Sequence, residues 1–174
     1  MSLCTLTLAQ FIPIPLVALA RDLALLDASI DRFRFLVLDE AALEKPVGTT
    51  AVTAPNPRID GAGELQTNLI VFPFDGRAGR VTLGRNPKRS EIVIRDQRVS
   101  GAHAAIAPCD AHSSWLIDLA SSNGTFLGPH CLPPGEAGRV VLQPGARFML
   151  ANVGIRFLSG NLMRELARAA APAG

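Results

Sequence analysis

The sequence predicts a mostly β protein, a sandwich or a barrel built from many short strands. Three observations support this prediction. Short β-like runs follow one another between residues 69 and 158, from "LIVFPF" to "GIRFL". Glycine, proline, asparagine and aspartate separate these runs at close intervals, which is typical of sheets joined by tight turns. No helical hydrophobic period interrupts the series.

The residues that precede this region follow a different pattern. Leucine, alanine and isoleucine recur at helical spacing over residues 16–30, which predicts an amphipathic helix. The alternation in "RFRFLVL" predicts a strand over residues 32–38. Residues 45–66 contain three prolines and three glycines and predict a linker. We therefore expect an N-terminal extension over residues 1–68.

The runs between residues 69 and 158 predict the strands of the main domain. In chain order they are "LIVFPF", "RVTLG", "EIVI", "HAAIA", "WLIDL", "TFLG", "RVVL", "RFML" and "GIRFL". Beyond Gly160, "NLMRELARAAA" contains good helix formers and begins with an asparagine, a residue type that caps helices. It predicts a short helix within a C-terminal tail over residues 159–174.

Length and charge limit the possible classes of function. The chain has 174 residues, enough for one domain with extensions, and a net charge of +2. So small a net charge argues against bulk electrostatic attraction to nucleic acid as the main role. Residues 1–68 carry five basic and eight acidic side chains, whereas residues 69–160 carry ten basic and six acidic. The later region is therefore the better candidate to bind an anionic partner.

The cysteines and the apolar N-terminus bear on the compartment. Cys4, Cys109 and Cys131 are an odd number of cysteines and do not suggest a disulfide framework. The first twenty residues are apolar, but they contain no basic residue and two prolines interrupt them, unlike a secretory signal. No stretch is long enough to span a bilayer. We therefore expect a soluble, cytoplasmic protein without membrane contact.

Catalysis is a weak interpretation of the polar residues. Ser100 and His103 are three residues apart, but a serine–histidine pair also needs an oxyanion hole and an orienting acid. The chain has no G-x-S-x-G elbow. The glycine-containing stretches "DGRAG" and "GPHCLPPG" match neither a Walker motif nor a dinucleotide fingerprint. The sequence therefore predicts no enzyme and no cofactor.

Metal binding is an equally weak interpretation. Cys109 with His112, and His130 with Cys131, contain the two cysteines and two histidines of a tetrahedral zinc set. Adjacent residues of a strand point in opposite directions, so the pair at residues 130 and 131 is a poor chelator. Two loop histidines and two small apolar residues are the simpler interpretation, and we expect no metal site.

A docking site explains more of these residues. Arg85 follows a predicted strand, Ser100 lies in a second loop, and Ser122 and Asn123 lie in a third, where Gly124 supplies the turn. A guanidinium, two hydroxyls and an amide on one rigid β scaffold suit a phosphate carried by a peptide. Each residue also has an ordinary interpretation, since serines and Asn-Gly pairs are common in turns that bind no ligand.

The region "LGRNPKRSEIVIRDQRVSGAHAAIAPCDAHSSWLIDLASSNGTFLG" resembles a forkhead-associated (FHA) domain. Such domains carry three short motifs in this order and at similar separations. Their counterparts here are Gly84-Arg85, Ser100-x-x-His103 and Ser121-Ser122-Asn123-Gly124-Thr125. The resemblance covers residues 69–158, about half of the chain. It implies a β-sandwich of about eleven strands that binds phosphothreonine peptides through loops at one end.

The resemblance also implies roles for individual residues. Arg85 and Ser100 would hold the phosphate, and Ser122 would add a hydroxyl. Asn123 would hydrogen-bond the peptide main chain, and Arg98 would help to select the third residue after the phosphothreonine. The residues with structural roles would be Gly84, His103 and Gly124.

The chain departs from the family pattern at three places. Gly101 stands where many members place a polar or basic side chain, which removes one expected phosphate contact. "LGPHCLPPG" replaces a second Asn-Gly pair and changes the neighbouring loop. Ala146 replaces an acidic residue that is frequent in one of the turns.

We therefore expect a non-catalytic module that binds phosphothreonine in a partner protein, downstream of a Ser/Thr kinase. The alternative is a phosphate-independent assembly module, in which residues 1–68 pack on the sandwich. A further hypothesis concerns Thr49, Thr50 and Thr53 of the linker, one of which would be phosphorylated and occupy the chain's own site. An ordinary linker is the simpler interpretation, since no acidic cluster marks a kinase site there.

Overall fold

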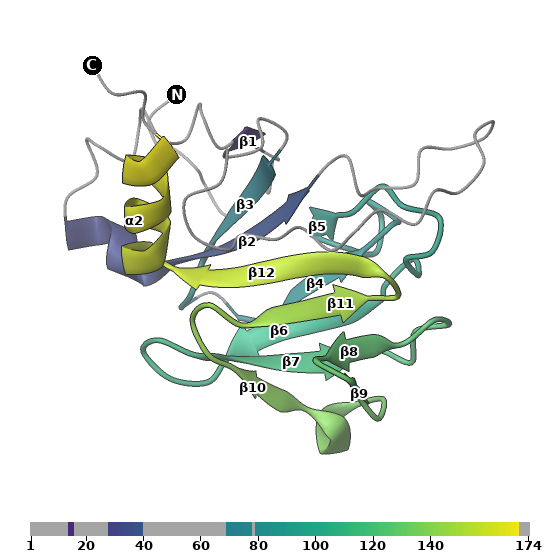
Figure 1. The fold of residues 1–174 in the computed structure, drawn as a ribbon. Coiled ribbons are helices and arrows are strands. Elements are labelled where there is room, and N and C mark those ends of the chain that lie inside the picture. The colour runs from purple at the N-terminus through teal and green to yellow at the C-terminus, as the bar shows by residue number, and fades with distance from the viewer. Residues whose placement is uncertain (1–13, 16–27, 40–68, 78, 171–174) are drawn as a thin grey trace.

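A seven-stranded and a five-stranded sheet form a β-sandwich in a computed structural model of the protein (Figure 1). The structure describes residues 14–15, 28–39, 69–77 and 79–170. The elements in chain order are β1 (Ile14–Pro15), the 3₁₀ helix η2 (Ala28–Arg32), β2 (Phe33–Asp39), β3 (Leu69–Asp75), β4 (Val81–Gly84), β5 (Ile92–Val93), β6 (Ala104–Pro108), β7 (Ser114–Asp118), β8 (Thr125–Leu127), β9 (His130–Cys131), the 3₁₀ helix η4 (Glu136–Gly138), β10 (Val140–Leu142), β11 (Arg147–Leu150), β12 (Val153–Ser159) and the helix α2 (Gly160–Ala170).

The seven-stranded sheet has the order β1-β3-β2-β12-β11-β8-β9, and the five-stranded sheet has the order β10-β7-β6-β4-β5. Neighbouring strands are antiparallel except β4 and β5, which are parallel. Strand β2 lies between β3 and β12, where Leu36 pairs with Phe72 on one side and Phe157 on the other. A strand from the expected N-terminal extension therefore contributes to the sandwich, while the domain boundary at residue 68 stays a prediction.

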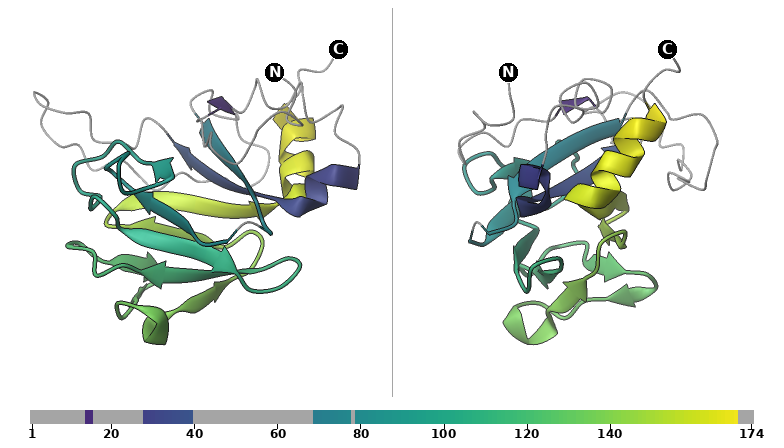
Figure 2. Two further views of the ribbon diagram at one scale, coloured as in Figure 1. Left: turned by 180° about the vertical axis from the view of Figure 1, so that it is seen from behind. Right: turned by 90° about the vertical axis from the view of Figure 1, so that its left-hand side faces the viewer.

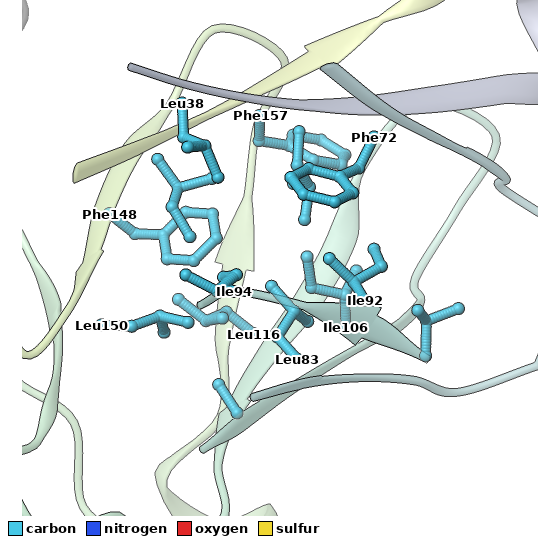
Figure 3. Packing of buried hydrophobic residues seen from close by; sticks show 14 of the residues in the cluster. Leu38, Phe72, Leu83, Ile92, Ile94, Ile106, Leu116, Phe148, Leu150 and Phe157 are labelled. Atoms are coloured by element: carbon cyan, nitrogen blue, oxygen red, sulfur yellow. The ribbon is translucent and has the colours of Figure 1, made fainter. Parts of the chain in front are cut away.

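Alternate residues of the strands form one apolar core between the sheets. In β12, Val153, Ile155 and Phe157 are buried and face this core, whereas Gly154 and Arg156 are partly exposed, as the two-residue period of a strand requires. Full burial of such a side chain contributes about 1.5–3 kcal/mol. Figure 3 shows the cluster, in which the labelled residues are Leu38, Phe72, Leu83, Ile92, Ile94, Ile106, Leu116, Phe148, Leu150 and Phe157.

The other face of the seven-stranded sheet is also apolar. Phe35 and Val37 of β2 and Leu158 of β12 alternate with the core residues and are nevertheless buried. Helix α2 lies against η2, β2 and β12 (Figure 2), and its Met163 is fully buried. The C-terminal helix therefore covers part of this face, at the end of the sandwich where β12 finishes.

The mostly β fold, the sandwich and the C-terminal helix that the sequence predicts are confirmed. The strand expected over residues 32–38 is β2, and each predicted run between residues 69 and 158 contains a strand. The two-residue strands β1 and β9 were not predicted, because prolines in and around Ile14–Pro15 and His130–Cys131 interrupt any apolar run there. No helix in the described part of the chain is long and apolar enough to cross a membrane.

Two expectations fall largely or wholly on residues outside those described. The helix expected over residues 16–30 overlaps the described residues only from residue 28, where the chain forms the 3₁₀ helix η2. The linker expected over residues 45–66, together with its three threonines, lies outside the described residues altogether.

Candidate functional site

Three loops meet at one end of the sandwich, opposite α2 and on the right-hand side of Figure 1. They span residues 85–91, 94–103 and 119–124, which follow β4, β5 and β7. The first two are joined by a hydrogen bond from Arg85 N to Ser100 O of 2.9 Å. The second and third are joined by a hydrogen bond from Ser122 N to Ser100 Oγ of 3.0 Å. The fold thus brings the three motifs of the sequence together.

Gly84 allows the first two loops to approach closely. A Cβ atom at this residue would lie 2.4 Å from Gly101 O and 2.5 Å from Ser90 Oγ, which is well inside van der Waals contact. The hydroxyl of Ser90 donates to the same carbonyl at 2.9 Å, and Asn86 N donates to it at 3.1 Å. Only glycine fits at residue 84 without separating the two chain segments.

The side chains of Ser100 and Ser122 lie beside each other, and the Arg85 side chain is bonded to the main chain directly before Ser100. Arg85 Nε donates to Val99 O at 3.2 Å, and its two terminal nitrogens make no hydrogen bond to the part of the chain that the structure describes. Ser100 Oγ accepts from Ser122 N and lies 3.5 Å from Ser122 Oγ. The Ser100 hydroxyl donates to Ser122 Oγ only across 3.5 Å, the long limit of a hydrogen bond, so a closer acceptor on a ligand can take its hydrogen.

His103 joins the second and third loops through hydrogen bonds of its buried imidazole. Its Nδ1 accepts from Ser100 N at 3.0 Å, so its Nε2 carries the proton and donates to Gly124 O at 3.0 Å. The residue is fully buried, and this burial lowers its pKa against the opposing effects of Gly124 O and the Asp118 carboxylate. The imidazole is therefore neutral at neutral pH. Both ring nitrogens are occupied and neither contacts the Ser100 hydroxyl, so the residues do not form a nucleophile–base pair.

Asp118 organises the third loop, although no sequence motif singled it out. It is 3% exposed, and its carboxylate accepts from Ser121 N at 3.1 Å, from Ser121 Oγ at 2.6 Å and from Thr125 Oγ1 at 2.6 Å. Burial alone raises the pKa of Asp118, but the hydrogen bonds from Ser121 and Thr125 outweigh burial and lower it. In the sequence, the hydroxyl residues Ser121 and Thr125 on either side of the Asn-Gly turn could have indicated a buried hydrogen-bond acceptor nearby.

Asn123 and Arg98 connect the same two loops at a second point. Asn123 Nδ2 donates to Arg98 O at 2.7 Å, and the side chain of Asn123 is exposed. The Arg98 guanidinium binds Asp96 through Nε to Oδ1 at 2.8 Å and Nη2 to Oδ2 at 2.5 Å. Asp96, whose side chain is fully buried, was not predicted as part of the site. The Asp96 carboxylate therefore compensates the charge of Arg98 within the protein. The role of Arg98 in selecting a peptide residue stays a prediction.

Gly124 forms the turn that follows Asn123. Its φ of +80° lies in the left-handed region that favours glycine. A Cβ atom there would also lie 3.1 Å from Cys131 Sγ, so β9 packs against the back of the turn.

The two pairs considered for zinc occur at different elements. Cys109 and His112 belong to the connection between β6 and β7, whereas His130 and Cys131 form β9. Among the described residues, no group of three or more histidine, cysteine, aspartate or glutamate side chains is arranged to hold a metal ion.

Comparisons with known proteins agree with this architecture. The family model of the FHA domain matches residues 81–151. The fold is similar to that of the FHA domain of the CT664 protein from Chlamydia trachomatis, with a TM-score of 0.50 and 19% sequence identity over 72% of this chain and 97% of that chain. No curated protein sequence matches the chain.

Two further structures with lower scores were found. EmbR from Mycobacterium tuberculosis, in complex with a low affinity phosphopeptide, has a TM-score of 0.47 and 18% identity over 72% of this chain and 24% of that chain. Full-length yeast Pml1p has a TM-score of 0.47 and 18% identity over 82% of this chain and 92% of that chain. The family model matches residues 81–151, which contain all three motifs, and this match confirms the resemblance to FHA domains over that part of the chain.

Proposed function

We propose that the chain binds phosphothreonine peptides at the end of the sandwich and does not cleave them. The observation that carries this proposal is the joining of the Arg85 loop to the Ser100 loop. Arg85 is bonded through its main chain to Ser100 O and through its Nε to Val99 O. A guanidinium and a serine hydroxyl are thereby presented to solvent from one rigid scaffold, which suits a phosphoryl group.

The donors would be in place before the ligand arrives. His103 and Asp118 are buried and hold the Ser100 and Asn123 loops through hydrogen bonds on two sides. A preorganised site loses less conformational entropy on binding than loops that must become ordered. Charge-assisted hydrogen bonds to an exposed phosphate contribute about 1.5 kcal/mol each, at the low end of their range. We therefore expect micromolar affinity, about −8 kcal/mol.

The preference for threonine over serine and the link to signalling are the finer parts of the proposal. An apolar contact with the threonine methyl would favour phosphothreonine by about 0.8 kcal/mol, roughly fourfold in affinity. A Ser/Thr kinase acting on the partner protein would then control the interaction. Asn123 would bind the main chain of the peptide; its exposed side chain and the bond from its Nδ2 to Arg98 O support this role.

Titration by fluorescence anisotropy tests the proposal with matched peptides that carry threonine, phosphoserine or phosphothreonine. We expect tightest binding of the phosphothreonine peptide, binding roughly fourfold weaker for phosphoserine and none for the plain peptide. Arg85→Ala should weaken binding about tenfold to hundredfold. Arg147→Ala is the matched control, since Arg147 is an exposed arginine at the start of β11, away from the three loops. Equal affinity for phosphorylated and plain peptides would reject phosphate recognition.

A pull-down distinguishes phosphothreonine recognition from the alternative function, phosphate-independent assembly. A phosphate-independent assembly module would retain its protein partner after phosphatase treatment. Loss of the partner both after phosphatase treatment and in the Arg85→Ala variant supports phosphothreonine recognition. Retention in both cases favours assembly through another surface of the protein.

A further inference from the structure

The loop that follows β4 begins with a tight turn over residues 86–89. Arg89 N donates to Asn86 O at 2.9 Å, and Lys88 N donates to Asn86 Oδ1 at 2.9 Å. These two bonds are those of a β-turn opened by an asparagine side chain. They fix the backbone from which the Arg89 side chain leaves the loop.

This turn is joined to the loop that contains Ser100. Asn86 N donates to Gly101 O at 3.1 Å, one residue after the bond from Arg85 N to Ser100 O. A Cβ atom built on Gly101 would lie 3.6 Å from Asn86 Cβ and 3.7 Å from Arg89 Nη1. The guanidinium of Arg89 therefore lies beside Gly101, the residue that directly follows Ser100 and has no side chain of its own.

The charge of Arg89 is not compensated within the described part of the chain. Its side chain is exposed and makes no hydrogen bond or ion pair with the described residues, where only its main-chain N–H is bonded. The carboxylates of the neighbouring loops have other partners, because Asp96 binds Arg98 and Asp118 binds Ser121 and Thr125. The guanidinium remains available to an anion from outside.

A phosphothreonine carries a charge of about −1.5 to −2 at neutral pH, so a single arginine leaves it incompletely neutralised. We propose that Arg89 is the second cationic residue of the phosphate site and reaches over Gly101 toward the phosphoryl group that Arg85 binds. The turn over residues 86–89 would thereby supply from a neighbouring loop the positive charge that residue 101 lacks. This inference rests on the proposed function and adds to it a residue that determines affinity.

The test moves the charge from residue 89 to residue 101. We expect Arg89→Ala to weaken binding of the phosphothreonine peptide about tenfold, the loss of one charge-assisted hydrogen bond. Gly101→Lys added to Arg89→Ala should restore the affinity to within about threefold of the wild type, since a Cβ atom at residue 101 meets only ordinary contacts. Lys88→Ala is the control, because Lys88 is exposed in the same turn, and it should change the affinity by less than about twofold.

Thermal unfolding of each variant separates a binding role from a structural one. Unchanged unfolding temperatures together with weakened binding and rescue by Gly101→Lys support the inference. An Arg89→Ala affinity equal to that of the wild type, while Arg85→Ala abolishes binding, overturns the inference and leaves the proposed function standing. Weakened binding without rescue, accompanied by a lower unfolding temperature, also overturns it. Failure of the wild type to distinguish phosphorylated from plain peptides removes the proposed function itself.

Discussion

Gly84→Ala tests whether close approach of two loops builds the site. The added Cβ atom would lie 2.4 Å from Gly101 O and 2.5 Å from Ser90 Oγ, whereas ordinary contact begins at 3.4 Å. The loop at residue 101 must therefore move by about 1 Å, because a main-chain carbonyl cannot rotate away as a flexible side chain does. The φ of Gly84 lies outside the left-handed region, so the effect is purely one of contact.

The magnitude follows from what this movement breaks. It would remove the hydrogen bonds from Arg85 N to Ser100 O and from Asn86 N to Gly101 O, each worth about 1 kcal/mol net. Overpacking adds about 1–3 kcal/mol. We expect the free energy of unfolding to fall by about 3–5 kcal/mol and the affinity for a phosphothreonine peptide to fall by about tenfold or more.

Urea unfolding and anisotropy titration measure both effects. The control is Gly101→Ala, which makes the same chemical change on the other side of the contact. A Cβ atom there lies 3.6 Å from its nearest neighbour, so this variant should change stability by less than about 0.5 kcal/mol. Equal behaviour of the two variants would refute the reasoning that the approach at Gly84 is sterically limited.

Three further predictions concern buried polar side chains. Asp118→Asn should lower the free energy of unfolding by about 2–3 kcal/mol at pH 7, because the hydrogen bonds from Ser121 and Thr125 to the carboxylate are weakened. The folded-state pKa of Asp118 lies below its ordinary value of 3.8, so the carboxylate stabilises the folded protein above pH 3.8 and loses this effect as the pH falls through the lower pKa. The pKa of His103 is lower in the folded protein than in the unfolded chain, so the unfolded chain is protonated first as the pH falls. At pH values under about 6.5 the free energy of unfolding should therefore decrease by up to about 1.4 kcal/mol per pH unit. Arg34→Met should lower the free energy of unfolding by about 3 kcal/mol and leave the peptide affinity unchanged. The Arg34 guanidinium is buried beside η2 and donates to the main-chain oxygens of Asp31, Phe33 and Ala111.

Each of these has an outcome that contradicts it. The urea midpoints of wild type and Asp118→Asn, measured from about pH 2 to pH 7, should draw closer as the pH falls below 3.8. Parallel curves would contradict the carboxylate argument. His103→Gln should lose the slope below pH 6.5, and an unaltered slope would assign it to another group. An Arg34→Met variant that folds with full stability but binds peptide poorly would place Arg34 in the site rather than in the scaffold.

The sequence alone determined the class of fold and the order of the motifs. Alternation of apolar and polar residues is a local property, so the run of residues that forms β12 indicates a strand by itself. Three motifs at fitting separations predicted the loops that carry Arg85, Ser100 and Asn123. The residues within each motif lie close together in the chain, and local periodicity or spacing reports them directly.

Tertiary structure alone decided which segments become neighbours. The position of β2 between β3 and β12, the bond from Asn123 to Arg98 O and the bond from His103 to Gly124 O all depend on the folded arrangement. The placement of Arg89 beside Gly101 depends on it as well. Strand pairing and loop contact join residues distant in the chain, and their energies depend on packing and register that no local pattern encodes.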